Sequence, residues 1–531
     1  MTAASAQIGP GAVAWHPRTN PWLIASAVML TTFMVVLDST VVNVALPHIA
    51  GSMSASVEEA TWTLTSFLVA MAIVLPATGW LGSLLGRKRL LLACVVVFTL
   101  ASVACGAAQS LGFLIVARVI QGLGGGAMQP ISQAVLLESF PPKKRGVAMA
   151  VFGLGVVVAP IIGPTLGGWI TDNYSWRWIF YINIPIGLMA VSLIKAFLED
   201  PPYIRTARPG RLDLFGLVVL AIWVGSLHVA LDKGQQEDWL SSPLIGALLA
   251  MAAVGFIVFI FWEWHARHPV VDLHILRDRN FSVGTGLITV VGAVLYGSTA
   301  LLPLFLQTLL GYTALKSGLT VSPRGVGSLV AMFMVGRLIG LIDGRALLVG
   351  GFIALAYSTY ALGNLDLQIA PSSVVWPNIL TGLSLGFIFV PLTTSAMGML
   401  RNEQMANATG IYNLMRNIGG AVGIALMTTM LARGGQVHQT IMVAHATPYN
   451  APYQQQLQAI QSGLAPISGN YLAAQQAYGV LYGQVGRQAT LWAFVDNFRL
   501  LAAMTVLCMP ALLLLRRLRH EKHATQPAIA D

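Results

Sequence analysis

Fourteen apolar stretches recur along the chain and constrain its fold more than any other feature. A helix of about 20 apolar residues is long enough to cross the hydrocarbon core of a bilayer, which is about 30 Å thick. The sequence therefore predicts an all-α polytopic membrane protein with 14 transmembrane helices. The stretches cover residues 22–46, 61–82, 90–108, 111–137, 146–170, 178–198, 213–231, 243–262, 281–306, 318–337, 345–363, 374–400, 407–432 and 492–515.

The composition agrees with this class, because 56% of the 531 residues are hydrophobic and only 9% are charged. Residues 1–21 lack a short apolar core with a cleavage site, so we expect no cleaved signal peptide. Neither the three cysteines nor the 10 histidines show metal-ligand spacing, and no phosphate-binding loop is present. We therefore expect no metal, no cofactor and no direct use of ATP.

The net charge of +10 reflects topology. Lys and Arg gather in alternate connections between the apolar stretches, and the connections between them carry little positive charge. Cytoplasmic loops carry the excess of positive charge, so both termini are predicted to be cytoplasmic and no nucleic-acid partner is implied. The basic connections include residues 87–89, 143–145, 205–211, 267–279 and 337–345, and the tail after residue 515 is also basic.

The chain is predicted to contain two similar six-helix bundles. The connection after the second stretch has Gly79 followed by Gly86, Arg87 and Lys88, and a related Gly-Arg pattern occurs at 336–345. Such duplication favours a substrate site between the bundles. The expected division is residues 1–21 as a tail, 22–198 and 281–515 as bundles, 199–280 as a linker with two extra membrane helices, and 516–531 as a second tail.

Two charged residues lie inside apolar stretches of the N-terminal half. Asp38 is placed in the sequence Leu-Asp-Ser-Thr-Val-Val-Asn-Val-Ala-Leu-Pro at 37–47, and Arg118 is in the fourth stretch at nearly the same depth. An ionised carboxylate in a membrane costs at least about 2.5 kcal/mol, so such residues are functional candidates. Arg118 can hold Asp38 ionised until substrate or a proton intervenes. The alternative is a static ion pair that joins helices.

The fifth stretch combines small residues with prolines. Gly155, Gly163 and Gly167 form a smooth stripe with Ala159, which favours close helix contact. Pro160 and Pro164 each remove a backbone donor and bend a helix, which suits a hinge or gate. Small-residue packing alone would indicate only tight contact.

The connection at residues 433–491 is much longer than the others, and residues 434–486 contain no Asp, Glu, Lys or Arg. Tyr453, Leu457, Ile460 and Leu464 share one helical face, and a second stripe, which includes Tyr471, Tyr478 and Tyr482, follows Pro466 and Gly469. We predict a helical hairpin outside the cytoplasm with an aromatic and amide surface for a partner. The alternatives are packing on the protein's own outer surface or a loose tether.

These motifs together resemble the major facilitator superfamily, in particular its 14-span drug:proton antiporters of the EmrB/QacA type. The resemblance rests on residues 37–47, 118–122, 155–168 and 172–185, and it extends over about residues 22–515. One departure is that Ser83 and Leu84 stand where the family carries an acidic and then a basic residue.

The resemblance implies proton-driven multidrug efflux by alternating access across a bacterial inner membrane. It implies that Asp38 is the proton-coupling carboxylate, Arg118 its partner, and the fifth stretch the gate. It also implies a periplasmic adaptor protein that leads to an outer-membrane channel. We expect the cavity for hydrophobic substrates to include Met34, Val41, Asn43, Gln121, Tyr296, Asn413 and Arg416. The rival hypotheses are a proton-coupled importer of an amphipathic metabolite, a passive channel and a membrane enzyme.

Overall fold

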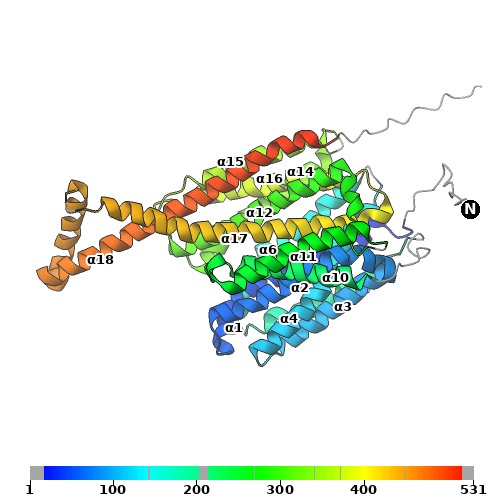
Figure 1. Cartoon of the computed structure of the whole chain (residues 1–531), viewed down its shortest axis with the longest axis horizontal. Coiled ribbons are helices and arrows are strands. Elements are labelled where there is room, and N and C mark those ends of the chain that lie inside the picture. The colour runs from blue at the N-terminus through cyan, green and yellow to red at the C-terminus, as the bar shows by residue number, and fades with distance from the viewer. Residues whose placement is uncertain are drawn as a thin grey trace, which may run out of the picture.

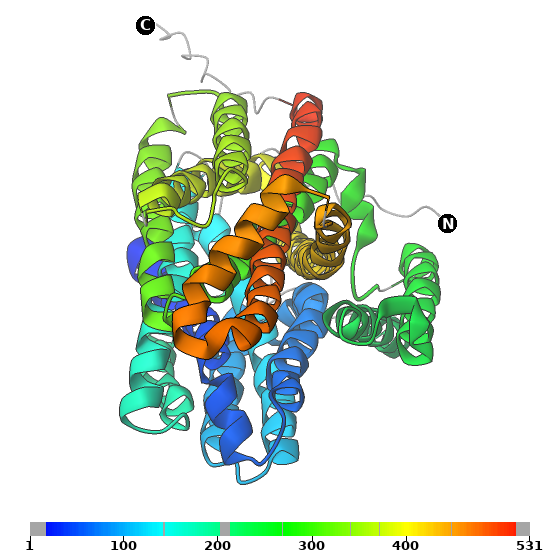
Figure 2. The ribbon, with the colours of Figure 1, turned by 90° about the vertical axis from the view of Figure 1, so that its left-hand side faces the viewer.

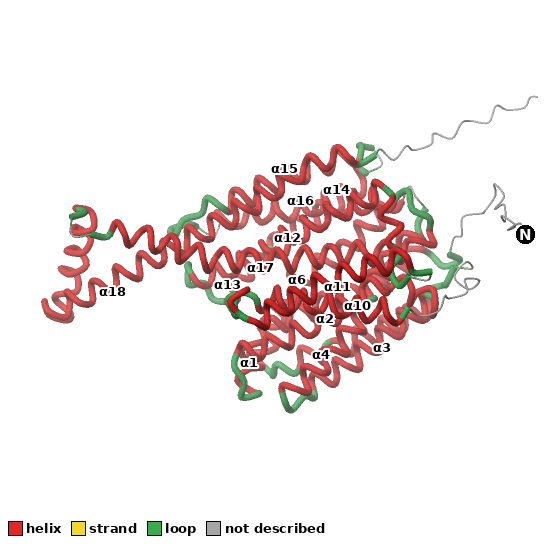
Figure 3. The backbone as a smooth tube through the Cα atoms, viewed as in Figure 1, coloured by secondary structure: helices red, strands yellow, loops and turns green. Residues whose placement is uncertain are grey.

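The computed structural model describes residues 17–141, 144–201, 213–267, 269–339, 341–370, 372–447 and 449–516. Within these ranges the chain contains no strand, and 14 helices are long and apolar enough to cross a membrane. The predicted all-α membrane architecture is therefore confirmed. Most of the helices run along the long axis of the molecule, and the loops that join them are short (Figures 1 and 3).

The N-terminal half forms six of the crossings. Two stretches that the sequence predicts as single helices are divided, because 111–137 breaks at Ala127 and 178–198 breaks at Ile182. The helices are α1 (Pro21–Ser52), α2 (Val57–Leu85), α3 (Arg87–Gly106), α4 (Leu111–Gly126), α5 (Met128–Ser139), α6 (Arg145–Asn173), α7 (Trp178–Tyr181) and α8 (Asn183–Phe197).

The C-terminal half forms another six crossings. The helices are α12 (Arg279–Thr308), α13 (Ala314–Val321), α14 (Pro323–Leu338), α15 (Gly344–Leu362), α16 (Ser372–Met397), α17 (Met405–His445) and α18 (Ala451–Cys508). Short 3-10 helices accompany them at η3 (Leu273–Arg277), η4 (Asn402–Gln404) and η5 (Met509–Leu514).

The two extra crossings, α10 (Leu214–Lys233) and α11 (Pro243–His265), lie at the side of the molecule and are green in Figure 2. α10 contacts both α2 and α17. The Thr65 hydroxyl donates a hydrogen bond of 2.5 Å to the Asp232 carboxylate. In η2 (Trp239–Ser241), the Trp239 indole donates one of 3.0 Å to the Thr429 hydroxyl. The pair is therefore hydrogen-bonded to both halves.

The two halves meet along one surface, in which α2, α5 and α6 contact α14, α16 and α17. Gly79 packs so closely on Asn407 that an added Cβ would approach the Asn407 Cα to 2.9 Å. Nearby, Arg145 donates a hydrogen bond of 3.1 Å to the Asn402 amide oxygen. These contacts lie at the end of the bundle that the basic connections predict to be cytoplasmic. We call this surface the cytoplasmic seam.

The predicted connection at residues 433–491 is not a separate loop. α17 continues past residue 432 to His445, and α18 begins at Ala451 rather than near residue 492. Inside α18 the helix breaks at Gly469, whose φ of 76° is in the left-handed region that favours glycine. The predicted helix, break and helix are present, but they continue the two membrane helices α17 and α18. They project from the bundle, and we call residues 433–491 the outer hairpin (Figures 1 and 2).

The outer hairpin presents tyrosines to its surroundings. Leu457 is buried, as are Ala473 and Ala477 on the helix that follows the break. Tyr471, Tyr478 and Tyr482 are 78%, 55% and 64% exposed. The tyrosine stripe therefore faces outward and does not pack on the protein's own outer surface.

Candidate functional site

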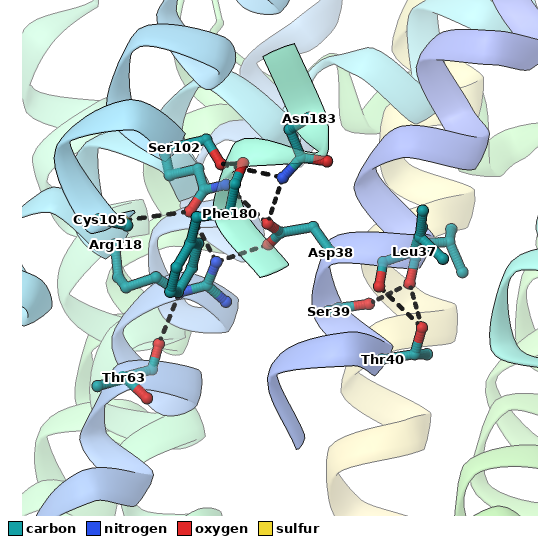
Figure 4. A network of polar contacts seen from close by, with 12 residues as sticks. Leu37, Asp38, Ser39, Thr40, Thr63, Ser102, Cys105, Arg118, Phe180 and Asn183 are labelled. Atoms are coloured by element: carbon teal, nitrogen blue, oxygen red, sulfur yellow. Dashed lines mark hydrogen bonds and ion pairs between the residues drawn. The ribbon is translucent and has the colours of Figure 1, made fainter. Parts of the chain in front are cut away.

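The Asp38 carboxylate lies in the middle of the N-terminal half and is 1% exposed. α1 places it against α4 and α8, which supply three side-chain donors (Figure 4). Arg118 donates from Nη1 to Oδ2 at 2.6 Å, while Gln121 and Asn183 donate to Oδ1 at 2.9 Å and 2.8 Å. The direct ion pair, which similar depth alone could not establish, is present in the structure.

Arg118 is held by groups other than Asp38 as well. Its Nη1 also donates to the Gln121 amide oxygen at 2.7 Å, and its Nε donates to the Thr63 carbonyl oxygen at 3.0 Å. The Phe67 ring covers the guanidinium, with 4.0 Å from its centroid to Cζ. The side chains of Arg118 and Asp38 are both 0% exposed, so each charge depends on the other for compensation.

Asn183 is a site residue that the sequence reasoning did not single out. It is the first residue of α8, and the break between α7 and α8 turns its amide toward Asp38. The same amide nitrogen donates to the Ser102 hydroxyl at 2.9 Å, and that hydroxyl donates to the Phe180 carbonyl oxygen at 2.9 Å. The available signal was an asparagine inside an apolar stretch, within the motif at 172–185.

The glycine stripe of α6 packs on α1 beside this network. A Cβ added at Gly163 would overlap the Thr40 side chain, and one added at Gly167 would meet Val41 at 2.9 Å. Gly155 is also buried, and a Cβ added there would meet the Met29 carbonyl oxygen at 3.4 Å. Pro160 is half-buried, and the side chain of Pro164 lies outside the described part of the structure.

The C-terminal half contributes a second buried polar group to the cytoplasmic seam. Arg416 on α17 donates from Nη2 to the Gln129 amide oxygen of α5 at 2.8 Å. One turn away, Asn413 donates to the Gln133 amide oxygen at 2.8 Å. Sequence reasoning missed both glutamines, although their spacing of four residues in an apolar helix places them on one face.

The other residues predicted to line a cavity do not join one cluster. Met34 and Val41 are 0% exposed and pack inside the N-terminal half. Asn43 is exposed on the opposite side of α1 from this packing. The Tyr296 side chain is 36% exposed, and its ring lies against Gly420 of α17. The structure thus brings Asp38, Arg118 and Gln121 together and places Asn413 and Arg416 across the seam.

The connection after α2 has an acidic partner that the sequence motif did not reveal. Gly86 adopts a φ of 80°, and the Lys88 backbone N–H donates to the Asp200 carboxylate at 2.8 Å. Arg87 forms a buried ion pair with Glu138 near the end of α5. The sequence has no acid at Ser83, and the acidic partners of this connection are Glu138 on α5 and Asp200 after α8.

Residues 28–424 of the chain match the Major Facilitator Superfamily. The chain is 40% identical to the multidrug export protein EmrB of Haemophilus influenzae, over 86% of its own length and 89% of the relative. It is 36% identical to the fatty acid resistance protein FarB of Neisseria gonorrhoeae, over 86% and 89% of the two lengths.

The fold is similar to that of solved transporters. The crystal structure of a double tryptophan mutant of XylE superposes with a TM-score of 0.60 at 13% sequence identity, and covers 94% of this chain and 97% of that one. At this identity the likeness concerns the fold alone. The sequence matches and the fold together identify a transporter and not an enzyme. The chain belongs to the major facilitator superfamily.

Proposed function

We propose that this protein is a proton-driven multidrug efflux transporter, which exports hydrophobic and amphipathic compounds across a bacterial inner membrane by alternating access. The names of its relatives support export of several compounds, because they include a multidrug export protein and a fatty acid resistance protein. The observation that carries the proton-driven part is the fully buried Asp38 carboxylate with its three donors.

Asp38 is suited to couple the uptake of a proton to a change in the arrangement of the helices. In the described state, Arg118, Gln121 and Asn183 compensate its charge. A movement that separates Arg118 from Asp38 leaves an uncompensated charge inside the membrane, and uptake of a proton by the carboxylate removes that charge. Protonation of Asp38 is thereby coupled to the position of α4 relative to α1.

The contact between α1 and α6 is the proposed gate. Thr40 is two residues from Asp38 on α1, and it packs on Gly163 of α6. Because the two backbones approach closely there, a movement of α6 displaces Thr40 and with it α1, which carries Asp38 about half a turn away on its opposite face. The same proposed gate extends along α6 and includes Gly155, Pro160, Pro164 and Gly167.

The test uses purified protein in proteoliposomes with an imposed pH gradient and a fluorescent hydrophobic substrate. Asp38→Asn keeps hydrogen bonding at this position, so we expect a folded protein whose gradient-driven transport falls to the background of empty liposomes. Asp172→Asn, at the end of α6 and away from the network, is the matched control and should transport as the wild type does. Gradient-driven transport at the wild-type rate by the Asp38 variant would refute the assignment.

The outer hairpin is the proposed docking surface for a periplasmic adaptor protein and, through it, an outer-membrane channel. Its exposed tyrosines and the absence of Asp, Glu, Lys and Arg from residues 434–486 support a largely neutral contact. Tyrosine is enriched at protein interfaces because it combines apolar area with a hydroxyl.

Replacing residues 450–481 with a short Gly/Ser linker tests this docking. The cut leaves the hydrogen bond of 2.7 Å between His438 and Asp496, which joins the bases of the two arms. We expect normal transport in proteoliposomes but loss of export from intact cells and of adaptor co-purification. Full recovery of the adaptor with the shortened protein would show that it docks elsewhere.

A further inference from the structure

Arg416 is a buried cation without an acidic partner. The residue is 3% exposed, and in the described part of the chain no Asp or Glu oxygen lies within 4.0 Å of its guanidinium. Its hydrogen bond goes to the neutral amide oxygen of Gln129, and its Nε is buried without a partner. The Phe389 ring is 5.8 Å from Cζ and adds a weak cation–π contact.

The position of Arg416 places this cation at the level of the bilayer centre. It follows the first residue of α17 by 11 residues, which is about 16 Å along a helix axis and about half of the hydrocarbon thickness. Asn413 and Asn407 lie on the same helix nearer to the cytoplasmic end, where they contact Gln133 and Gly79. Among the described polar contacts of the cytoplasmic seam, the Arg416–Gln129 bond is therefore the one farthest from the cytoplasm.

Two other membrane arginines differ from Arg416. Arg118 is already compensated by Asp38. Arg324, near the start of α14, donates to the Ser298 and Thr299 hydroxyls of α12 within the C-terminal half. Arg416 alone among these three has a contact that must break when α5 and α17 separate.

We propose that Arg416 and Gln129 form a binding site for the anionic group of an amphiphilic substrate, such as a carboxylate, and that the Gln129 amide oxygen occupies this site when the seam is closed. This proposal rests on the proposed export function and adds a substrate class to it.

Gln129 and an anionic substrate group compete as acceptors for the Arg416 guanidinium. Opening of the seam to the cytoplasm removes Gln129 and leaves a guanidinium at mid-membrane depth with no acid nearby. A carboxylate binds a guanidinium through two parallel hydrogen bonds between opposite charges, whereas Gln129 offers one neutral amide oxygen, so the carboxylate is the stronger acceptor. Closing of the seam returns Gln129 and completes the surface between the halves, which favours release of the anion toward the other side.

The experiment measures equilibrium binding of radiolabelled dodecanoate and of dodecyltrimethylammonium to the full-length protein in nanodiscs, with empty nanodiscs as background. The two probes share a chain length and differ in the sign of the charge. We expect Arg416→Gln to weaken dodecanoate binding about 10- to 100-fold, the usual value of a charged hydrogen bond. Binding of the cationic probe should change by less than about threefold.

Gln129→Glu provides a second variant that does not remove a buried group. The new carboxylate would pair with Arg416, so dodecanoate binding should fall at least about 10-fold while the cationic probe is unaffected. Arg324→Gln is the charge-matched control and should leave binding of both probes within about threefold of the wild type.

Several outcomes would overturn the proposal. These are wild-type dodecanoate affinity in Arg416→Gln or Gln129→Glu, an equal loss for both probes, or no saturable dodecanoate binding to the wild-type protein. Because equilibrium binding needs no proton gradient, the binding measurement tests the anion site independently of proton-driven export. Dodecanoate binding that depends on Arg416, in a protein that shows no gradient-driven transport, would refute proton-driven export and keep the anion site.

Discussion

Each half of this transporter buries an arginine near the middle of the membrane, and the two arginines have opposite surroundings. Arg118 in the N-terminal half meets a carboxylate at 2.6 Å and has further bonds to an amide and a carbonyl oxygen. Arg416 in the C-terminal half meets a single amide oxygen at 2.8 Å, supplied by the other half. The first is compensated inside its own bundle, and the second depends on the seam.

The difference assigns separate tasks to the two halves. A compensated pair can store or release a proton without a ligand, because the carboxylate already belongs to the protein. An uncompensated cation has to obtain its anion from outside. We infer that the N-terminal half handles the proton and that the C-terminal half supplies the charge that an acidic substrate meets. The two halves thus share a six-helix architecture but differ in how the charge of their buried arginine is compensated.

The largest expected difference concerns stability. Arg118→Gln leaves the Asp38 charge buried and unpaired, which should lower the free energy of unfolding by about 3–5 kcal/mol. Arg416→Gln leaves no opposite charge behind, so the loss should be smaller, about 1.5–3 kcal/mol, that of one hydrogen bond with a charged donor. Equilibrium unfolding of both variants in the same mixed micelles measures the two losses. Equal losses would remove the basis of the comparison.

The two halves share a close approach of helices at a glycine, and the cost of filling it should be similar in both. A Cβ at Gly163 would overlap Thr40 of α1, and one at Gly419 would overlap the Thr289 carbonyl oxygen of α12. Gly163→Ala and Gly419→Ala should each lower the free energy of unfolding by about 1–3 kcal/mol through overpacking.

The glycine comparison has a matched control in the same helix. At Gly168 an added Cβ would find its nearest neighbour, a Val44 methyl group, at 3.8 Å, which is an ordinary contact. Gly168→Ala should therefore change the free energy of unfolding by less than about 0.5 kcal/mol. A loss at Gly168 as large as that at Gly163 would show that helix flexibility, not close approach, is being measured.

The smallest expected difference is between two buried asparagines. Asn183 donates to the Asp38 carboxylate, whereas Asn413 donates to the neutral Gln133 amide. Asn183→Ala should cost about 1 kcal/mol more than Asn413→Ala, because hydrogen bonds to charged groups are stronger. The same unfolding measurement compares them, and a larger loss for Asn413→Ala would reverse the assignment of charge to the N-terminal half.

Much of the fold could be predicted because hydropathy records contact with lipid. The fourteen crossings and the special status of Asp38 and Arg118 follow from apolar length and from the cost of charge in hydrocarbon. The ends of α17 and α18 could not be found in this way. Both helices leave the membrane as polar helices, so the apolar signal stops while the helix continues.

The partners of the charged residues were harder to predict than the residues themselves. Gln129, Gln133 and Asn183 are neutral amides in apolar segments, and each could bond to many helices. Glu138 likewise gives no hint that Arg87, on a different helix, is its partner. Which of these side chains meet depends on helix rotation and crossing, and a single sequence does not record either.

The length of α17 has a mechanical consequence. The helix has 41 residues, and at about 1.5 Å per residue it is about 60 Å long, twice the hydrocarbon thickness of about 30 Å. Its outer part is therefore a lever arm of about 30 Å that is rigidly connected to the C-terminal half. A rotation of about 15°, comparable to known subunit rotations, would sweep its tip by about 8 Å. Each transport cycle would then displace the outer end of α17, and a protein bound there would be moved with it.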